Sequence, residues 1–435
     1  MKLRSICLLV LSPLLSVPVY ARQAGQTTEL NVDGIKVILK HSPNKVVSAI
    51  LFIRGGTANY SLDQAGIENA TFGATTECGT TTLSRTAFKS KLETLGSSVS
   101  GLSGYDNGVI SLRCIRSSWD ASWALFTDAI LHPAFTDADF TIYKQKLISS
   151  ARQRISNPDA ELKLLAARTV FKGSNFEKIP QGTAESLTPL TAAAAASYYK
   201  MLLNKSRIFL VVVGNISAED LQTKVHEAFA GLEKGYYIPV APSSLDLPGS
   251  LNVEERPIAT NYIIGLMGAP SSRDSAYRAF QLGIRILYDR LFIELRTKRN
   301  LSYAPGASLN ANLLAYSTLS VSTTDPATSV SVMKEELNKI RTAGFSDKEV
   351  REMKSTFLTT FYMRQESNAS QAQALGGAEI LFGNWRKAET FTQDINKVSA
   401  TEINTAFKQH INTVNWIYLG KKEQADPKVF FNSLN

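Results

Sequence analysis

The sequence predicts an α+β protein built from two similar α/β roll domains, each with a mostly antiparallel sheet packed by helices. Three observations support this fold class. Short motifs recur at an offset of about 210 residues, strands and long helices follow one another in the same order in both halves, and adjacent strands are joined by a tight turn. A repeated element order of this length indicates an internal duplication.

The first 21 residues have the pattern of a cleavable signal peptide. Lys2 and Arg4 precede an apolar run from Ile6 to Val17, and the run is followed by Val19-Tyr20-Ala21, a cleavage site of the small-x-small type. A mature chain would then begin near Arg22, and its formal charge would fall from +9 to +7 because two basic residues are removed. We therefore expect a periplasmic or secreted protein.

The strands of the two halves can be paired. Val47–Arg54 stops at two glycines and Asn261–Met267 stops at Gly268, and β-branched residues and alternation indicate a strand in both cases. Near the end of each half a buried strand is again closed by glycine, at Ile208–Val213 and at Asn415–Leu419. In the first half, the strands 97–102 and 108–115 are separated by five turn residues, which predicts a hairpin.

A long helix is expected in each half at the same distance from a shared motif. Phe135-Thr136-Asp137 opens the helix 138–155, and Phe345-Ser346-Asp347 opens the helix 348–364. Ser or Thr at the N-cap and acidic residues in the first turn favour a helix start at both places. Residues 239–249 contain three prolines and little periodicity, as is typical of a linker. The predicted domains are therefore 22–238 and 250–435.

Composition excludes several classes of protein. No stretch after the signal peptide reaches the roughly 18 apolar residues of a membrane-spanning helix. Basic residues are scattered along the chain, so a solvated surface is expected and no nucleic-acid face. Two cysteines remain after cleavage, Cys78 and Cys114. They permit one disulfide in an oxidising compartment or, equally, are two small buried residues, and mass measurement with and without reductant distinguishes these alternatives.

Several short motifs, in order and spacing, resemble the pitrilysin/insulinase family of zinc peptidases, which carry an H-x-x-E-H site. The resemblance extends through nearly the whole mature chain. The motifs are Gly55-Gly56-Thr57, Gly66-Ile67, Gly79-Thr80, Leu95-Gly96, Gly182-Thr183-Ala184-Glu185-Ser186-Leu187 and Val212-Val213-Gly214-Asn215-Ile216. The resemblance implies two similar α/β domains in each subunit.

The sequence departs from the family at the zinc site. The matching helix reads Gly66-Ile67-Glu68-Asn69-Ala70-Thr71-Phe72-Gly73. Asn69 and Gly73 stand where the family has its two zinc-binding histidines, and Phe72 stands where it has the catalytic glutamate. The third ligand of the family would fall near Ser150, in a segment from Lys144 to Arg154 without an acidic residue. None of these side chains can replace imidazole or carboxylate in binding zinc.

Since the zinc site of the family is lost, we considered whether other residues could bind a metal, and none is expected to do so. The four histidines are far apart in sequence, and Glu68 and Glu77 alone would make a poor zinc site without a histidine. These histidines are His41, His132, His226 and His410. We therefore expect no cofactor in this chain.

A second feature of the family is retained. The segment Arg296-Thr297-Lys298-Arg299-Asn300-Leu301-Ser302-Tyr303 resembles the second-domain segment in which Arg and Tyr, seven residues apart, face the zinc site and hold the scissile peptide. The resemblance assigns Arg296 and Tyr303 as hydrogen-bond donors to the substrate oxyanion or neighbouring carbonyls. Lys298 and Arg299 are expected to have surface roles only.

Loss of one feature and retention of the other imply a division of labour. The family includes two-subunit enzymes in which one chain carries H-x-x-E-H and zinc while the other supplies Arg and Tyr. The resemblance therefore implies a heterodimer with a zinc-bearing homologous subunit that cleaves peptides or unfolded segments. The alternative is a scaffold or peptide-binding homologue without catalysis. A neighbouring gene for an exported homologue with intact H-x-x-E-H would favour the enzyme.

Overall fold

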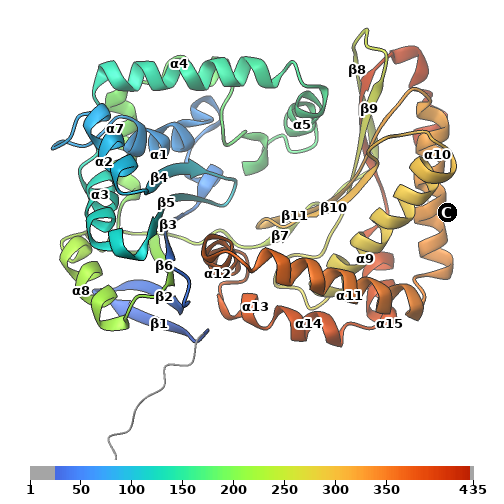
Figure 1. The fold of residues 1–435 in the computed structure, drawn as a ribbon. Coiled ribbons are helices and arrows are strands. Elements are labelled where there is room, and N and C mark those ends of the chain that lie inside the picture. Colours follow the sequence, from blue (N-terminus) through green and yellow to red (C-terminus); the bar gives the residue numbers. More distant parts are fainter. Residues whose placement is uncertain (1–24, 432–435) are drawn as a thin grey trace, which may run out of the picture.

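The computed structural model describes residues 25–431, so the predicted signal peptide lies outside the described residues. The chain forms two halves, each built on one sheet (Figure 1). The sheet of the first half has the strand order β1-β2-β6-β3-β5-β4. Its strands are β1 (Thr27–Val32), β2 (Ile35–His41), β3 (Val46–Arg54), β4 (Ser98–Ser103), β5 (Asn107–Ile115) and β6 (Ile208–Gly214).

The sheet of the second half repeats this arrangement. Its order is β10-β11-β9-β12-β8, and the short strand β7 pairs with β11 away from this path. Its strands are β7 (Ser243–Ser244), β8 (Ser250–Glu255), β9 (Asn261–Met267), β10 (Gly306–Asn310), β11 (Leu314–Thr323) and β12 (Asn415–Gly420). One pair on the main path of each sheet is parallel, β2 with β6 and β8 with β12, and the other pairs are antiparallel.

The two sheets have matching strand orders, and helices pack on both, which confirms the α+β class. The series β2-β6-β3-β5-β4 corresponds to β8-β12-β9-β11-β10, with the parallel pair at the same place. The hairpin predicted from the turn residues is the β4–β5 pair, in which Ser103 faces Gly108. A duplicated α/β unit accounts for this repeated order.

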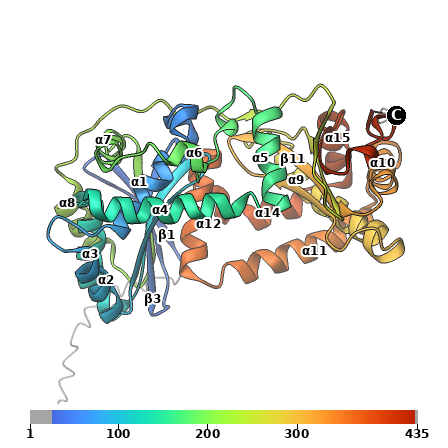
Figure 2. The same cartoon turned by 90° about the horizontal axis from the view of Figure 1, so that it is seen from above.

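Helices pack on both sheets, as Figure 2 shows from above. Those of the first half are α1 (Ile67–Glu77), α2 (Arg85–Thr94), α3 (Trp119–Leu131), α4 (Asp137–Arg154), α5 (Pro158–Thr169), α6 (Ala184–Leu187), α7 (Ala192–Leu202) and α8 (Ala218–Phe229). Those of the second half are α9 (Tyr277–Leu291), the π-helix η5 (Phe292–Lys298), α10 (Pro326–Ala343), α11 (Asp347–Arg364), α12 (Asn368–Phe382), α13 (Arg386–Glu389), α14 (Phe391–Lys397), α15 (Ala400–His410) and α16 (Pro427–Phe431). Short 3-10 helices are η1 (Gly56–Asn59), η2 (Leu62–Gln64), η3 (Arg116–Ser118), η4 (Asn175–Glu177) and η6 (Lys422–Gln424).

The long helices begin where their caps predict. At α4 the Thr136 hydroxyl accepts a hydrogen bond from the Asp139 amide at 3.2 Å. At α11 the Ser346 hydroxyl accepts from the Glu349 amide at 3.3 Å, and the Glu349 carboxylate accepts from the Ser346 amide at 2.9 Å. These bonds satisfy amides that have no partner within the helix, so they fix where each helix starts.

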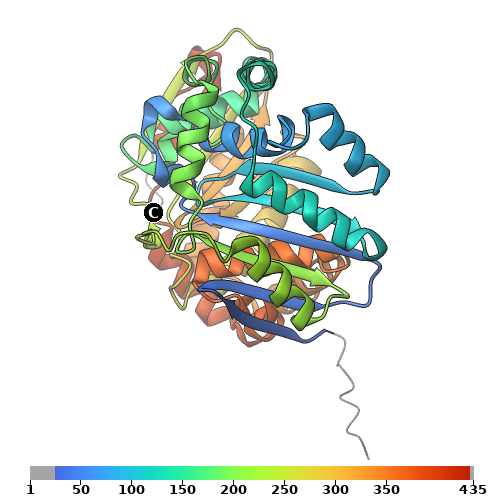
Figure 3. The same ribbon diagram turned by 90° about the vertical axis from the view of Figure 1, so that its left-hand side faces the viewer.

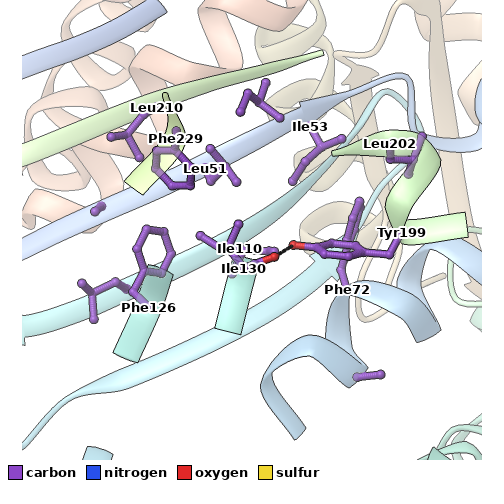
Figure 4. Packing of buried hydrophobic residues seen from close by; sticks show 14 of the residues in the cluster. Leu51, Ile53, Phe72, Ile110, Phe126, Ile130, Tyr199, Leu202, Leu210 and Phe229 are labelled. Carbon is purple, nitrogen blue, oxygen red and sulfur yellow. Dashed lines mark hydrogen bonds between the residues drawn. The ribbon is translucent and has the colours of Figure 1, made fainter. Parts of the chain in front are cut away.

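The first sheet is buried on both faces. Residues 47–53 of β3 are all buried, which explains why this strand reads as a continuous apolar run. One face packs on α1, α3, α7 and α8 of the same half, as Figure 3 shows from the first half. Figure 4 shows this core, where Phe72, Ile110, Phe126 and Tyr199 lie together.

The other face of each sheet is covered by a helix from the opposite half. The α12 helix of the second half packs on β3 and β6, and α5 of the first half packs on β9 and β12 (Figure 1). Ala372 and Leu375 of α12 join Phe52 in one buried cluster. The approach is close, because a Cβ atom at Gly376 would lie 2.0 Å from Cζ of Phe52. The two halves are therefore interlocked by exchanged helices.

The predicted linker is an ordered part of this assembly. Within residues 239–249, Ser243 and Ser244 pair in parallel with Leu314 and Ala315 of β11, and Leu247 is buried. The segment therefore packs along the second sheet. The domain limits 22–238 and 250–435 stay a prediction.

Candidate functional site

The helix predicted to have lost its zinc ligands is α1, which lies directly against the edge strand β4. A Cβ atom at Gly101 of β4 would lie 1.9 Å from the Phe72 carbonyl oxygen of α1, so only glycine permits this approach. The Asn69 side chain accepts a hydrogen bond from the Ser103 amide at 3.2 Å. The residue at the first histidine position therefore serves to tie the helix to the sheet edge.

The next two positions are filled by apolar and aromatic packing. Phe72 is fully buried. Its ring lies edge-on to Tyr199, with centroids 6.1 Å apart (Figure 4). At Gly73 the vacant side-chain position is taken by Tyr143 of α4, whose hydroxyl would be 1.8 Å from an added Cβ. A second imidazole has no room there.

The third predicted position also fails to supply a ligand. Ser150 is exposed on α4, and Tyr143, seven residues earlier on the same helix, is the residue that reaches α1. Within residues 25–431, no three His, Cys, Asp or Glu side chains gather as a metal site would require. The residues at this place do not fit zinc. The role of Tyr143 has no local signal in the sequence, since it depends on how α4 crosses α1.

We expect Gly73→Ala to lower the free energy of unfolding by about 1–2 kcal/mol, because the methyl group collides with the buried Tyr143 ring. Adding Tyr143→Phe should recover part of this loss, because the nearest atom is the hydroxyl oxygen. Urea unfolding of the two single variants and the double variant measures the coupling. Gly377→Ala on α12 is the matched control, where an added Cβ meets nothing within 4 Å. Equal losses at both glycines would contradict the assignment.

A buried carboxylate lies beside the former zinc positions. Glu68 is completely buried and accepts hydrogen bonds from Asn59 at 2.8 Å, Ser103 at 2.8 Å and Tyr198 at 2.7 Å. Burial raises the pKa of Glu68 to about 7, although these three bonds and the charge of Arg207 oppose the rise. Desolvation therefore outweighs the hydrogen bonds. The carboxyl group links η1, β4 and α7 to α1.

The raised pKa predicts a specific pH dependence. The folded state holds the Glu68 proton more tightly than the unfolded chain, whose pKa is near 4.5. The resulting stabilisation is present below about pH 4.5 and is lost as the pH rises through about 7, up to about 3 kcal/mol. Glu68→Gln should remove this slope, so urea unfolding at pH 5 and pH 8 should show the wild-type protein losing stability relative to the variant. If the free energy of unfolding changed equally with pH in the wild-type protein and in Glu68→Gln, a raised pKa at Glu68 would be ruled out.

Both cysteines are free and buried, which corresponds to the second of the two alternatives for this pair. Burial raises the pKa of Cys78 to about 12 and that of Cys114 to about 11, so neither thiol is poised as a nucleophile. Three of the four histidines have separate neighbours. His132 lies 3.1 Å from Asp128, His226 lies 2.7 Å from Asp33, and His410 packs edge-on to Phe280.

The retained Arg/Tyr segment ends the long α9–η5 helix. Asn300 has φ 52°, its amide donates to the Arg296 carbonyl at 3.1 Å, and the Leu301 amide donates to the Leu295 carbonyl at 2.7 Å. These two bonds and the left-handed residue close the C-terminal end of the helix. The chain reverses there, which brings Tyr303 back over the last turn of η5.

Arg296 and Tyr303 are in direct contact. The guanidinium carbon of Arg296 lies 4.2 Å from the centroid of the Tyr303 ring and 5.0 Å from that of Phe292. Tyr303 is 78% exposed. Within the described residues, no carboxylate forms an ion pair with Arg296. Lys298 and Arg299 instead pair with Glu294. The cation is thus held by two rings and is open to an external acceptor.

The structure does not bring the Arg/Tyr segment to the former zinc helix. The π-helix η5 packs on α9 and α10 of the second half, whereas α1 packs on β4 and α7 of the first. The roles predicted for Asn69, Phe72 and Gly73 and for Arg296 and Tyr303 stay predictions. Each of the two places now has a defined geometry, one closed by packing and the other exposed.

Comparison with known proteins finds similarity to zinc peptidases. Residues 189–357 match the family model described as the peptidase M16 inactive domain. An uncharacterized zinc protease of Rickettsia felis is 22% identical over 351 residues, which cover 78% of this chain and 82% of that protein. An uncharacterized zinc protease of Mycobacterium leprae is 21% identical over 410 residues, covering 90% and 91%.

Solved structures share the fold. A peptidase M16 inactive domain from Pseudomonas fluorescens has a TM-score of 0.82 at 18% identity, covering 91% of this chain and 98% of that one. The periplasmic protease PqqL of Escherichia coli has a TM-score of 0.76 at 15% identity, covering 97% of this chain but 49% of that one. The match over residues 189–357, the relatives and the shared fold therefore make this chain similar to the M16 peptidases, the pitrilysin/insulinase family that its motifs resemble.

Proposed function

We propose that this chain is a catalytically incomplete subunit of a heteromeric zinc peptidase and that it supplies Arg296 and Tyr303 to the active site of a zinc-bearing homologous partner. One contrast carries the proposal. The zinc positions on α1 are closed by Phe72 and by Tyr143 over Gly73. In contrast, the half-buried Arg296 lies on the exposed ring of Tyr303, without a carboxylate partner among the described residues. A surface built in this way can act only on groups that come from outside.

The size relation to PqqL supports a second chain. The structural match to PqqL includes 97% of the present chain but only 49% of PqqL. A homologous partner of similar length would therefore complete an assembly of PqqL size. The domains 22–238 and 250–435 would each have a counterpart in such an assembly. The zinc would belong to the partner and none to this chain.

The chemistry assigned to the pair is hydrogen-bond donation. A guanidinium group presents several N–H donors in a fixed plane, and a phenol presents one O–H donor. Both can bind a substrate carbonyl oxygen and can bind it more strongly when negative charge develops on it. The ring of Tyr303 also limits the rotation of Arg296, which prepares the cation for that contact.

The proposed location is the periplasm, and the proposed substrates are peptides or unfolded segments. The pattern of residues 1–21 and the description of PqqL as a periplasmic protease support the location. In residues 25–431 the structure contains no helix long and apolar enough to cross a membrane.

Reconstitution tests the proposal. The mature chain alone should contain no stoichiometric zinc by elemental analysis and should not cleave fluorogenic peptides. Addition of a homologous subunit with H-x-x-E-H, identified by co-purification and mass spectrometry, should give peptidase activity that chelators abolish. Zinc together with turnover in the isolated chain would overturn the proposal. A complex that binds peptides without cleaving them would assign the chain to the scaffold class.

A further inference from the structure

A pocket in the second half is unrelated to the positions discussed so far. It has a volume of about 840 Å³ and lies between α9, α11 and α12, at the base of α14. Phe357 and Phe361 of α11 and Phe391 of α14 form an aromatic wall, with Phe361 and Phe391 stacked at 4.6 Å. Ala374 and Gly377 of α12 also line it.

The charges that line this pocket are all positive. They come from Arg278, Arg285, Arg364 and Lys387, and no carboxylate is among the lining residues. The adjoining pocket of about 830 Å³ differs, since Asp274, Asp394 and Glu402 contribute to it.

Two of the four cations already have carboxylate partners. Arg285 lies 3.4 Å from Asp289, and Lys387 lies 3.5 Å from Asp394. Within the part of the chain that the structure describes, Arg278 and Arg364 have no carboxylate within ion-pair distance. These two guanidinium groups are therefore the candidates for binding an external anion.

Arg278 is the best prepared of these cations. Its guanidinium carbon lies 4.8 Å from the ring centroids of both Phe382 and Phe391. It donates to the side chain of Gln281 at 3.0 Å and to the carbonyl of Lys387 at 3.2 Å. Burial lowers the pKa of Arg278. Asp394, which lines the adjoining pocket, partly opposes this shift but forms no ion pair with Arg278. A half-buried cation without an ion-pair partner is costly, and a bound anion would relieve that cost.

We propose that this pocket binds the carboxyl-terminal end of an extended peptide, with the terminal carboxylate on Arg278 and an apolar side chain against the aromatic wall of Phe357, Phe361 and Phe391. The neutral polar groups of the lining favour a peptide over a hydrocarbon chain. Gln281, Gln365, Gln373, Thr356, Thr360 and Ser370 can pair with peptide amides. Thr356 and Thr360 already donate to carbonyl groups one turn earlier. A hydrocarbon chain would place the side-chain amides of Gln365 and Gln373 against apolar groups, which is unfavourable for polar groups removed from water.

The dimensions suit a short segment. The part of α11 that lines the pocket, from Phe357 to Arg364, advances by seven residue steps, or about 10 Å at about 1.5 Å per step. An extended peptide advances about 3.3 Å per residue, so about three residues fit along it. This site does not depend on Arg296, Tyr303 or a partner, so its failure and that of the proposed function can be told apart.

The test compares two forms of one tripeptide in titration calorimetry with the mature chain. Acetyl-Ala-Phe-Leu with a free carboxyl group should bind at least about tenfold tighter than its amide, which is the effect of about 1.4 kcal/mol. Gly377→Leu should abolish binding of the acid, because a side chain there enters the pocket. The fold should remain, since an added Cβ meets nothing within 4 Å.

Arg278→Met should reduce the affinity for the free acid by about tenfold or more. Arg351→Met is the matched control, because Arg351 is exposed on α11 and does not line the pocket. If Arg278→Met fails to fold, the comparison of the acid with the amide and the Gly377→Leu variant still test whether the pocket binds a peptide carboxylate. Equal binding of acid and amide, unchanged binding in Gly377→Leu, or no binding would overturn the proposal. Binding of palmitate but of neither peptide form would overturn it in favour of a fatty acid.

Discussion

Replacing Arg296 by alanine is expected to lower the kcat of the reconstituted peptidase by about 100-fold, the scale of losing one donor to a developing oxyanion. The guanidinium lies over the exposed Tyr303 ring and has no carboxylate partner within the described residues. Its donors are therefore free for substrate. The effect should appear in kcat more than in KM if the contact strengthens in the transition state. Steady-state kinetics on a fluorogenic peptide measure both constants.

Three further variants separate donation from packing. Tyr303→Phe removes the hydroxyl but keeps the ring that supports Arg296, so its loss isolates the phenol. Arg296→Lys keeps the charge without the planar donor fork and should restore only part of the activity. Arg299→Ala is the matched control, because Arg299 is an exposed neighbour that pairs with Glu294. Full activity in both Arg296→Ala and Tyr303→Phe would rule out the roles assigned to them.

Glu379→Ala is expected to destabilise the protein by about 2–3 kcal/mol and to uncouple its halves. The Glu379 carboxylate is 3% exposed and accepts from Lys36 at 2.8 Å and Arg54 at 3.0 Å, both on the first sheet. Its other oxygen accepts from the Trp385 amide at 3.2 Å. Removing one partner of a buried ion pair costs about 3–5 kcal/mol. We expect a loss at or below the lower end of this range, because Lys36 and Arg54 are 34% and 22% exposed and water can partly solvate their charges.

Urea unfolding followed by two probes measures this effect. The wild-type chain should unfold in one transition, because α12 of the second half covers the first sheet, whereas Glu379→Ala should show separate transitions for the two halves. Arg386→Ala is the control. Its side chain is 57% exposed where it pairs with Glu29 at the same junction, so its loss should cost less than about 1 kcal/mol. A single unshifted transition in Glu379→Ala would contradict the role of this carboxylate.

Local patterns in the sequence predicted the elements well. The strand Asn261–Met267 has the predicted bounds, and the starts of α4 and α11 differ from prediction by one residue because their N-cap residues were recognised. The family resemblance placed Asn69, Phe72 and Gly73 at the zinc positions, and residue chemistry then predicted that they are unsuitable for zinc. Such features depend on neighbours in sequence, which is why the sequence is enough to find them.

Contacts between distant segments were not predictable in the same way. Nothing near Tyr143 indicates that its hydroxyl occupies the space at Gly73, since this depends on the crossing of α4 and α1. A weak signal did exist for Glu379, which is a lone carboxylate in the apolar run Ala378 to Phe382. Arg278 offers a similar signal between Tyr277 and Ala279 at the start of α9. A single charge in an apolar run indicates either a buried pair or a ligand contact.

The exchange of α5 and α12 has a consequence for how the chain folds. The first sheet is complete once β6 ends at Gly214, but its outer face remains without cover until residues 368–382 have formed α12. Apolar side chains such as Phe52 and Phe209 are exposed to solvent during that interval. Contacts between segments so far apart slow folding and leave intermediates prone to aggregation. We therefore expect the newly synthesised chain to depend on a chaperone until α12 has formed.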